Sequence, residues 1–265
     1  EIAKRIEGGL QYMMQAISAS PTTIAEILTL AAKIRAAEMT ISEVVDGFVA
    51  EDEADDYVAE EDFDEFDEED DDDGQGGSKA LTKKLEELKS QALERFALVR
   101  THFDKMRKAY EKDGYQSSSY NRAQMAVSAE IMSIRFTVKT IEKLCHILRS
   151  QVDDVRRYER ELRKIVVDKC GMPQDHFIKT FPPNSMNLKW AEKEIATGKS
   201  YSVVLARNLP AVQELQQKLI DLQARAVVPL EDLKQINKKM NAGEKASRDA
   251  KKEMIEANLR LVISI

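Results

Sequence analysis

Three consecutive residues, Gly198-Lys199-Ser200, could form the end of a loop that binds nucleotide phosphates. Such a loop needs another glycine five residues before Gly198 and a strand before that glycine, so that the backbone N–H groups of the loop can surround the phosphates. That earlier position is Lys193, within a segment of helical pattern. The sequence therefore gives little support to a nucleotide-dependent enzyme, and we predict a chain without catalytic residues and without a cofactor.

Cysteine and histidine residues are the other candidates for chemistry, as metal ligands or nucleophiles. Cys145 and His146 are neighbours, so on a helix their side chains point about 100° apart. Cys170 and His176 flank a proline turn, and no second pair stands at the spacing of a zinc site. Two cysteines also cannot build a disulfide framework. We predict packed, reduced thiols and no metal site.

An acidic run occupies residues 51–73, where 17 acidic residues stand without a basic one. The whole chain has 47 acidic and 40 basic residues, so outside this run 30 acidic residues face all 40 basic ones. The run lacks the glycine and terminal glutamate of a calcium loop. Low hydrophobicity and dense like charge predict a disordered, solvated tether over residues 49–78, attached to a basic body.

Two clusters of basic residues could bind phosphates or an acidic protein surface. The first comprises Arg156, Arg157, Arg160, Arg163 and Lys164. The second comprises Lys234, Lys238, Lys239, Lys245, Arg248, Lys251 and Lys252. Four acidic residues lie within helical pairing distance of the first cluster, which favours ordinary surface ion pairs there. They are Asp153, Asp154, Glu159 and Glu161. We expect binding at the second cluster.

The elements that position these residues are predicted to be helices. Six prolines and ten glycines leave long stretches in which apolar residues recur every three or four positions. This pattern predicts an all-α fold, an elongated multi-helix body with a disordered acidic loop. Helices are expected over residues 1–18, 22–34, 79–110, 131–155 with an extension toward 167, 209–222, 230–240 and 243–265, with short segments at 41–48 and around Trp190.

Several residues are expected to begin or end these helices. Thr22 or Thr23 is expected to cap the second helix, and Pro210 to lie in the first turn of its helix. Gly243 is expected to separate the last two helices. The acidic run is the expected boundary between packed parts.

The ends of the chain carry no sign of membrane insertion or secretion. No stretch approaches 18 consecutive apolar residues, and the N-terminus lacks the apolar core of a signal peptide. We therefore expect a cytoplasmic protein. The chain begins without Met and stops inside the apolar run 259–265, which is typical of a piece of a longer protein.

The two ends resemble conserved segments of a known family. Gly243-Glu244-Lys245-Ala246 leads into the sixteen residues from Ala250 to Ile265, AKKEMIEANLRLVISI. Their order of helix formers, asparagine and β-branched tail is similar to the start of region 2.1 of primary bacterial sigma factors, the sigma-70 family. Ile2-Ala3-Lys4-Arg5-Ile6-Glu7 resembles the end of that family's region 1.2. In many proteobacterial members a large helical insertion separates the two regions, and residues 10–240 look like it.

The resemblance implies how the chain is organised and what it does. It divides the chain into residues 1–48 (the end of region 1.2 and the first insertion helices), 49–78 (the acidic tether), 79–242 (the insertion) and 243–265 (the start of region 2.1). Family members bind the RNA polymerase core, direct it to promoter DNA and hold the melted non-template strand of the minus-ten element. Region 2.1 belongs to the domain that docks on the β′ clamp.

The resemblance also carries site residues over by matching position. Asn258 and Leu261 would line a pocket for a flipped base, since an amide can satisfy a base edge and a leucine can form an apolar wall. Backbone phosphates would be contacted by Lys251, Lys252 and Arg260, and Lys4 and Arg5 belong to a region that approaches DNA. The alternative role for Leu261 is core packing.

Several family segments are missing from these residues, including the principal clamp-binding helix and the aromatic, basic segments that read the minus-ten element. The fragment is therefore not expected to initiate transcription alone. A helical scaffold or coiled-coil adaptor with no DNA role is the alternative, because the stripes at 81–110 and 131–155 could form a sustained seam. A scaffold should self-associate, whereas the sigma interpretation predicts a monomer when free. It also predicts that the first and last helices pair, through Ile2, Ile6, Met254, Ala257 and Leu261.

Overall fold

The computed structural model describes residues 2–49 and 76–263, with side chains described over 2–49 and 82–260. The acidic run and most of the predicted tether lie outside these residues. The chain divides into two compact units, one formed by residues 1–146 and 238–265 and the other by residues 147–237. The segments on both sides of the acidic run thus belong to one unit, and the division between packed parts falls elsewhere than expected.

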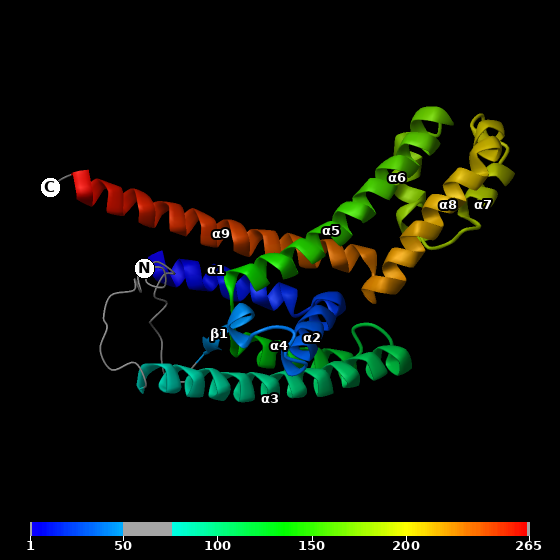
Figure 1. Cartoon of the computed structure of the whole chain (residues 1–265). Helices are drawn as coiled ribbons and strands as arrows, with labels where there is room; N and C mark the ends of the chain where they lie inside the picture. The colour runs from blue at the N-terminus through cyan, green and yellow to red at the C-terminus, as the bar shows by residue number, and fades with distance from the viewer. Residues whose placement is uncertain (1, 50–75, 264–265) are drawn as a thin grey trace. The chain divides into compact units, whose positions relative to one another are not determined.

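The elements of the first unit come from both ends of the chain (Figure 1). They are α1 (Ile2–Ile17), α2 (Pro21–Arg35), the short 3₁₀ helix η1 (Ile41–Glu43), β1 (Val45–Phe48), α3 (Gly76–Asp113), α4 (Ser118–Met132), β2 (Ile134–Phe136), the first part of α5 (Val138–Arg163) and the larger part of α9 (Leu230–Ile263). The second unit contains the rest of α5, the π-helical turn η3 (Lys164–Lys169), α6 (Gln174–Thr180), η4 (Pro182–Asn184), α7 (Trp190–Ala196), α8 (Ser202–Ala226) and the start of α9.

The core of the first unit lies where α3 packs against α4 and α2. The residues that fill it are almost completely shielded from solvent: Ile24, Ile27, Phe96, Val99, Met106, Val127 and Ile131. The helix predicted over residues 79–110 is confirmed, and it continues to Asp113, where Gly114 ends it with a positive φ of 87°. The all-α class is confirmed apart from one small sheet.

That sheet pairs β1 with β2 in antiparallel register, with Val45 opposite Phe136. The helix expected from residue 131 is therefore wrong over 134–136, and the segment at 41–48 is a 3₁₀ turn followed by a strand. Buried Ile134 and Phe136 flank a partly exposed Arg135, which is the alternation of a strand. Helix α4 lies between the helices expected over 79–110 and 131–155, where the sequence analysis placed no element.

Two helix starts differ from the sequence predictions. The N-cap of α2 is Ser20, with Pro21 in the first helical position, whereas the hydroxyl of Thr23 donates to the backbone carbonyl oxygens of Ile17 and Ser20. Helix α8 begins at Ser202, so Pro210 lies in its interior. Because Pro210 is exposed, water can reach the carbonyl group that loses its helical partner.

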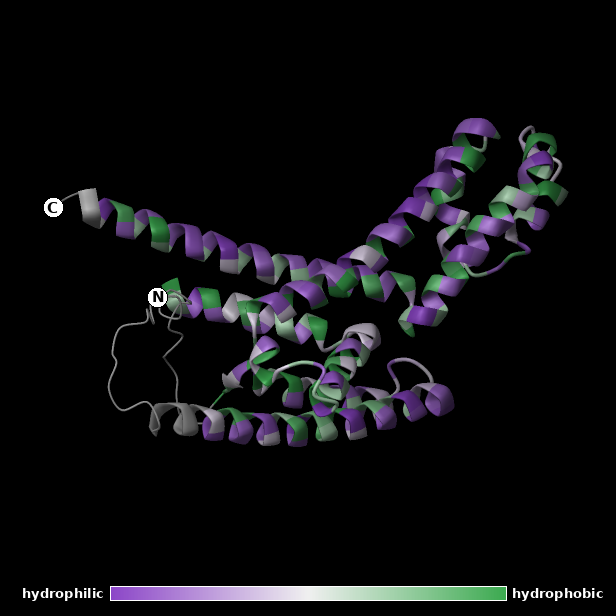
Figure 2. Cartoon of the chain, viewed as in Figure 1, coloured by the Kyte–Doolittle hydropathy of each residue, from purple (hydrophilic) through white to green (hydrophobic). Residues whose placement is uncertain are grey.

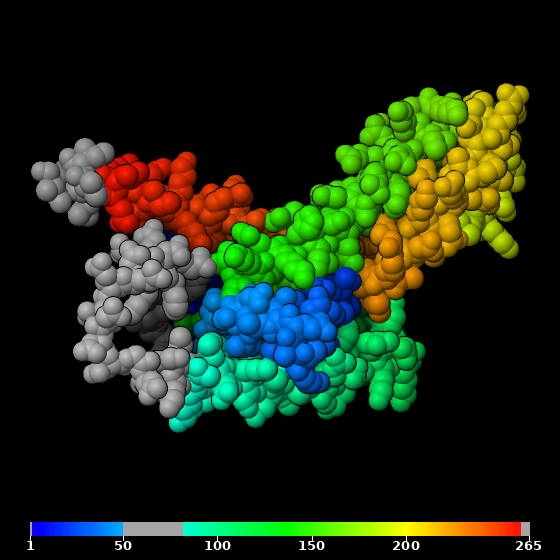
Figure 3. All heavy atoms as spheres, in the orientation of Figure 1, coloured from blue at the N-terminus to red at the C-terminus, as the bar shows by residue number. Residues whose placement is uncertain are grey.

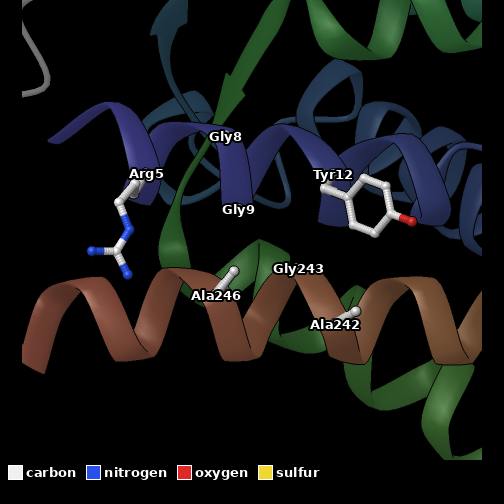
Figure 4. A pocket seen from close by; sticks show the side chains of 7 residues that line it. All are labelled: Arg5, Gly8, Gly9, Tyr12, Ala242, Gly243 and Ala246. Carbon is white, nitrogen blue, oxygen red and sulfur yellow. The ribbon is translucent and has the colours of Figure 1, made fainter. Parts of the chain in front are cut away.

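Gly243 does not interrupt α9, which runs as one helix from Leu230 to Ile263. It lies where α9 meets α1 in antiparallel orientation, as Figures 1 and 4 show. A Cβ atom on Gly243 would stand 2.8 Å from the carbonyl oxygen of Gly9 and 2.9 Å from the backbone nitrogen of Met13. A Cβ atom on Gly9 would stand 2.8 Å from the backbone nitrogen of Ser247. The glycines therefore permit a close approach of two backbones.

The predicted pairing of the first and last helices is thus present, but its seam lies elsewhere than expected. Ile6 is buried and Ile2 partly buried, whereas Met254 and Ala257 are exposed. The seam uses Gly243 and Ser247 instead, two small residues that let α1 come close. The side chain of Leu261 lies outside the described residues.

The second unit is anchored by an aromatic cluster and a buried carboxylate. Trp190, 2% exposed, packs edge-on against Phe177 and Phe181. Glu194 accepts hydrogen bonds from the Nε2 atom of His176 (2.9 Å) and the hydroxyl of Tyr201 (2.8 Å). Burial raises the pKa of Glu194, and these hydrogen bonds outweigh it, so the net shift is downward. None of the described helices combines the length and the apolar composition that a membrane-spanning segment needs.

Replacing Gly9 by alanine should destabilise the chain by about 1–3 kcal/mol, because the added Cβ meets backbone atoms at the crossing. Gly8 is the matched control, since a Cβ there meets nothing within 4 Å. Gly8→Ala should stabilise the chain by up to about 1 kcal/mol through helix propensity. Urea unfolding of the three proteins measures both values, and equal effects of the two substitutions would contradict the close approach.

Tyr201 should make the stability of the chain depend on alkaline pH. Burial, followed by the hydrogen bond to Glu194, raises the pKa of Tyr201 to about 12, above about 10 in an unfolded chain. The raised value stabilises the fold fully below pH 10, and this contribution is lost as the pH rises through about 12. The free energy of unfolding, measured with urea between about pH 9 and 12, should therefore fall less steeply for Tyr201→Phe than for the wild type. Identical slopes for Tyr201→Phe and the wild type would refute the assignment.

Candidate nucleic-acid interface

The end of α9 is open to solvent on every side over the residues whose side chains are described. Every residue over 251–260 is exposed, although α9 before this point carries a buried stripe that includes Met240, Ser247 and Ala250. A helix turns by about 100° per residue, so Met254 and Asn258 continue this stripe. The face of α9 that packs inward therefore becomes surface beyond Ala250, still within the first unit.

Large apolar side chains lie on this exposed segment. Met254 is 40% exposed, Ile255 59% and Leu259 55%. Figure 2 shows apolar and hydrophilic bands alternating toward the end of α9, and Figure 3 shows its surface uncovered in that view. Ile255 and Leu259 are four residues apart and so share a side of the helix. Ile255 and Leu259 therefore form an exposed apolar pair on the surface of α9.

The predicted DNA-binding residues on α9 whose side chains are described are all exposed, but they do not share one face. Lys251 and Asn258 are seven residues apart and lie on the same side. Lys252 lies a quarter turn away, with its ammonium nitrogen 3.9 Å from the carboxylate of Glu256. Arg260 lies nearly opposite Asn258. Position 261 continues the helix, but the Leu261 side chain lies outside the described residues.

Arg5, on α1, is held by an acidic residue of α9. Its guanidinium donates two hydrogen bonds to Glu253, at 2.6 Å and 3.1 Å, and both side chains are half exposed. Figure 4 shows Arg5 pointing from α1 toward α9. These hydrogen bonds lower the pKa of Glu253 and outweigh the small opposing effect of burial. Lys4 is exposed on the adjacent side of α1. The structure thus brings Arg5 to α9, where the guanidinium already binds the carboxylate of Glu253.

A shallow groove accompanies this pair between α1 and α9. It has a volume of about 390 Å³ and is lined by Arg5, Gly8, Gly9, Tyr12, Ala242, Gly243 and Ala246 (Figure 4). The bottom of the groove is formed by the small residues that allow the two helices to approach each other. The groove leads toward Arg5 and the exposed end of α9.

The second basic cluster is partly surface and partly structural. Lys234 belongs to the second unit, where its ammonium group lies 2.7 Å from Glu159 and 2.8 Å from Glu231. Lys238, Lys245, Arg248 and Lys252 follow one another along a single side of α9 and are exposed. This basic stripe continues into the side that carries Ile255 and Leu259.

The first basic cluster makes the ion pairs that its sequence suggested. Arg157 pairs with Asp154 at 2.8 Å, and Arg156 lies 3.8 Å from Asp153. The other chemical candidates have structural surroundings. Within the described residues no group of three potential ligands could hold a metal ion, both cysteines are buried, and position 193 lies in helix α7.

Sequence reasoning missed two features of this interface. The exposed apolar pair Ile255 and Leu259 shows a spacing of four residues that could have been noticed. Glu253 as the partner of Arg5 left no such signal, because the two residues are 248 positions apart.

The chain is similar to known proteins over its whole length. Residues 20–223 match the family described as "Sigma-70, non-essential region". Over its full length the chain is 39% identical to the RNA polymerase sigma factor RpoD of Neisseria gonorrhoeae, in an alignment of 277 positions. The match spans 43% of that relative's length.

The Arg5–Glu253 pair should appear in the titration of Glu253. Because the folded-state pKa lies below the ordinary value of 4.5, the pair stabilises the chain above that pH, and the contribution is lost as the pH falls through the lowered pKa. Carboxyl NMR between about pH 2 and 7 should place the Glu253 midpoint below 4.5 in the wild type and nearer 4.5 in Arg5→Gln. Equal midpoints in both proteins would show that the pair does not form in solution.

Proposed function

Since the chain belongs to the sigma-70 family of RNA polymerase sigma factors, we propose that it is part of a primary sigma factor that binds the RNA polymerase core and directs promoter recognition and melting in transcription initiation. Its contribution is binding rather than catalysis. Both partners are cytoplasmic in bacteria, and the protein would act there.

The exposed end of α9 is the observation that carries this proposal. It combines basic side chains for phosphates, an amide for a base edge and apolar side chains for a protein or base surface. Surface segments of soluble helices rarely expose several large apolar side chains without a partner. The family relationship supplies the partners that fit this mixture.

Asn258 is assigned to single-stranded promoter DNA. It lies on the side of Lys251 and next to exposed Met254, so one base edge, one phosphate and one apolar contact are available within two turns of helix. The bound segment is the non-template strand of the minus-ten element, and Leu261 and Arg260 are its further proposed contacts. Lys4 stands on α1 as an additional phosphate ligand.

Ile255 and Leu259 are assigned to the polymerase core. Both are more than half exposed and lie on the side of α9 that continues the basic stripe, so an apolar contact with a charged rim results. The β′ clamp is the proposed surface. On this proposal residues 1–48 end region 1.2, residues 49–78 form an acidic tether, residues 79–242 are the insertion and residues 243–265 begin region 2.1.

The assignment of Asn258 is tested with two alanine variants of this chain. Fluorescence anisotropy measures binding of a single-stranded oligonucleotide carrying the minus-ten sequence and of a scrambled one. Asn258→Ala should weaken binding of the minus-ten strand about fivefold or more and leave the scrambled strand unaffected, because only a base contact is lost. Lys251→Ala should weaken the binding of both strands equally. It should also reduce the slope of log K against log salt concentration by about 0.7 in magnitude.

The two variants control for each other, since both residues are exposed on one side of the same helix. Circular dichroism should show unchanged helicity in both. If the wild type does not distinguish the two strands at any salt concentration, the proposed DNA contact is wrong for this chain. If Ile255→Ser with Leu259→Ser leaves binding to the polymerase core unchanged, the core contact lies elsewhere.

A further inference from the structure

The ion pair between Arg5 and Glu253 lies inside the proposed DNA site, and it deepens the proposed function on which it rests. We infer that Glu253 is an internal competitor for DNA phosphate: its carboxylate occupies the Arg5 guanidinium in the free chain, and a phosphate takes its place when DNA binds. Glu253 thereby sets the affinity of the site and suppresses weak binding to any nucleic acid.

The geometry of the pair suits such an exchange. Two N–H groups of Arg5 reach the two carboxylate oxygens of Glu253, at 2.6 Å and 3.1 Å. A phosphate offers two oxygens to the same fork, so the guanidinium need not change its shape to accept it. The carboxylate therefore imitates the ligand that it excludes.

Exposure makes the exchange possible. Both side chains are 50% exposed, so a phosphate can approach the guanidinium from solvent, and water screens the attraction that must be broken. An arginine fixed in a buried pair could not exchange its partner at this low cost.

The pair also lies near Asn258 along α9. Glu253 and Asn258 are five residues apart, which separates them by about 7.5 Å along the helix axis and by about 140° around it. A strand whose base meets Asn258 must therefore curve around the helix to present a phosphate to Arg5.

The surroundings of Glu253 oppose its release, so it is a true competitor. The residues one turn away on its own helix are Asp249, Ala250, Glu256 and Ala257. None of them is a cation, and two repel a free carboxylate. Displacing Glu253 from Arg5 thus has a cost that DNA must overcome.

Four proteins test the inference: the wild-type chain, Arg5→Gln, Glu253→Gln and the double variant. The probe is a single-stranded oligonucleotide carrying the minus-ten sequence, and its Kd is measured over a range of salt concentrations. Glu253→Gln should bind about two- to fivefold more tightly at low salt, because no carboxylate has to leave. Arg5→Gln should bind more weakly, and the slope of log K against log salt concentration should fall by about 0.7 in magnitude. When Arg5→Gln is already present, adding Glu253→Gln should bring no comparable gain.

Glu256→Gln is the matched control, because it removes the same charge from an exposed position of the same helix one turn away. Its effect should be the same in the wild-type chain and in Arg5→Gln, because the ion pair described for Glu256 is with Lys252. An equal gain from Glu253→Gln in both backgrounds would reduce the effect to general electrostatics and overturn the inference. A loss of affinity in Glu253→Gln would also overturn it and would make the pair a structural clamp.

Failure of the inference and failure of the proposed function give different results. If the wild type shows no salt-dependent binding of the oligonucleotide, the proposed function and the inference are both wrong. If the wild type binds, and Asn258→Ala weakens binding while the Arg5 and Glu253 effects are additive, only the competition is wrong.

Discussion

The close approach of α1 and α9 is the constraint on which the first unit depends. Helix axes usually stand about 8–10 Å apart, and side chains set that distance. At Gly9 and Gly243 no side chain intervenes, and Ser247 adds only a hydroxymethyl group. Two segments more than 230 residues apart in sequence therefore become one antiparallel pair, and the intervening chain must leave and return to the same place.

This constraint also shapes the proposed interface. The inward stripe of α9 continues from Ala250 to Met254 and Asn258, but the close contacts with α1 are made by Gly243 and Ser247. Beyond the Arg5–Glu253 pair the stripe is exposed. A face whose composition suits burial is thus exposed over residues 251–260. The association surface is a continuation of the core pattern rather than a separate patch.

Local patterns predicted the long helices but not the contacts between distant segments. The stripe from Ala92 to Met106 and the aromatic anchor Trp190 could be found from the sequence, since each depends on neighbours in the chain. Gly243 could not be interpreted correctly, because glycine serves both to end a helix and to admit a second backbone. β2 was missed for a similar reason: Ile131, Ile134 and Val138 fit a helix, whereas Ile134 and Phe136 fit the strand that β1 requires.

The sequence identifies the basic residues but not the role of each one. The exposed fraction of each side chain in the structure distinguishes these roles. Burial lowers the pKa of Lys234, yet hydrogen bonds from its ammonium to Glu159 and Glu231 raise it overall, and its side chain is only 20% exposed. If the lysine turned outward, the partly buried Glu159 would lose its partner. Arg5 has an equally short contact, but half of its side chain and half of Glu253 face solvent. Two arrangements that look alike as ion pairs therefore differ in whether a phosphate can enter them, and only the exposed one can serve both as a structural contact and as a binding site.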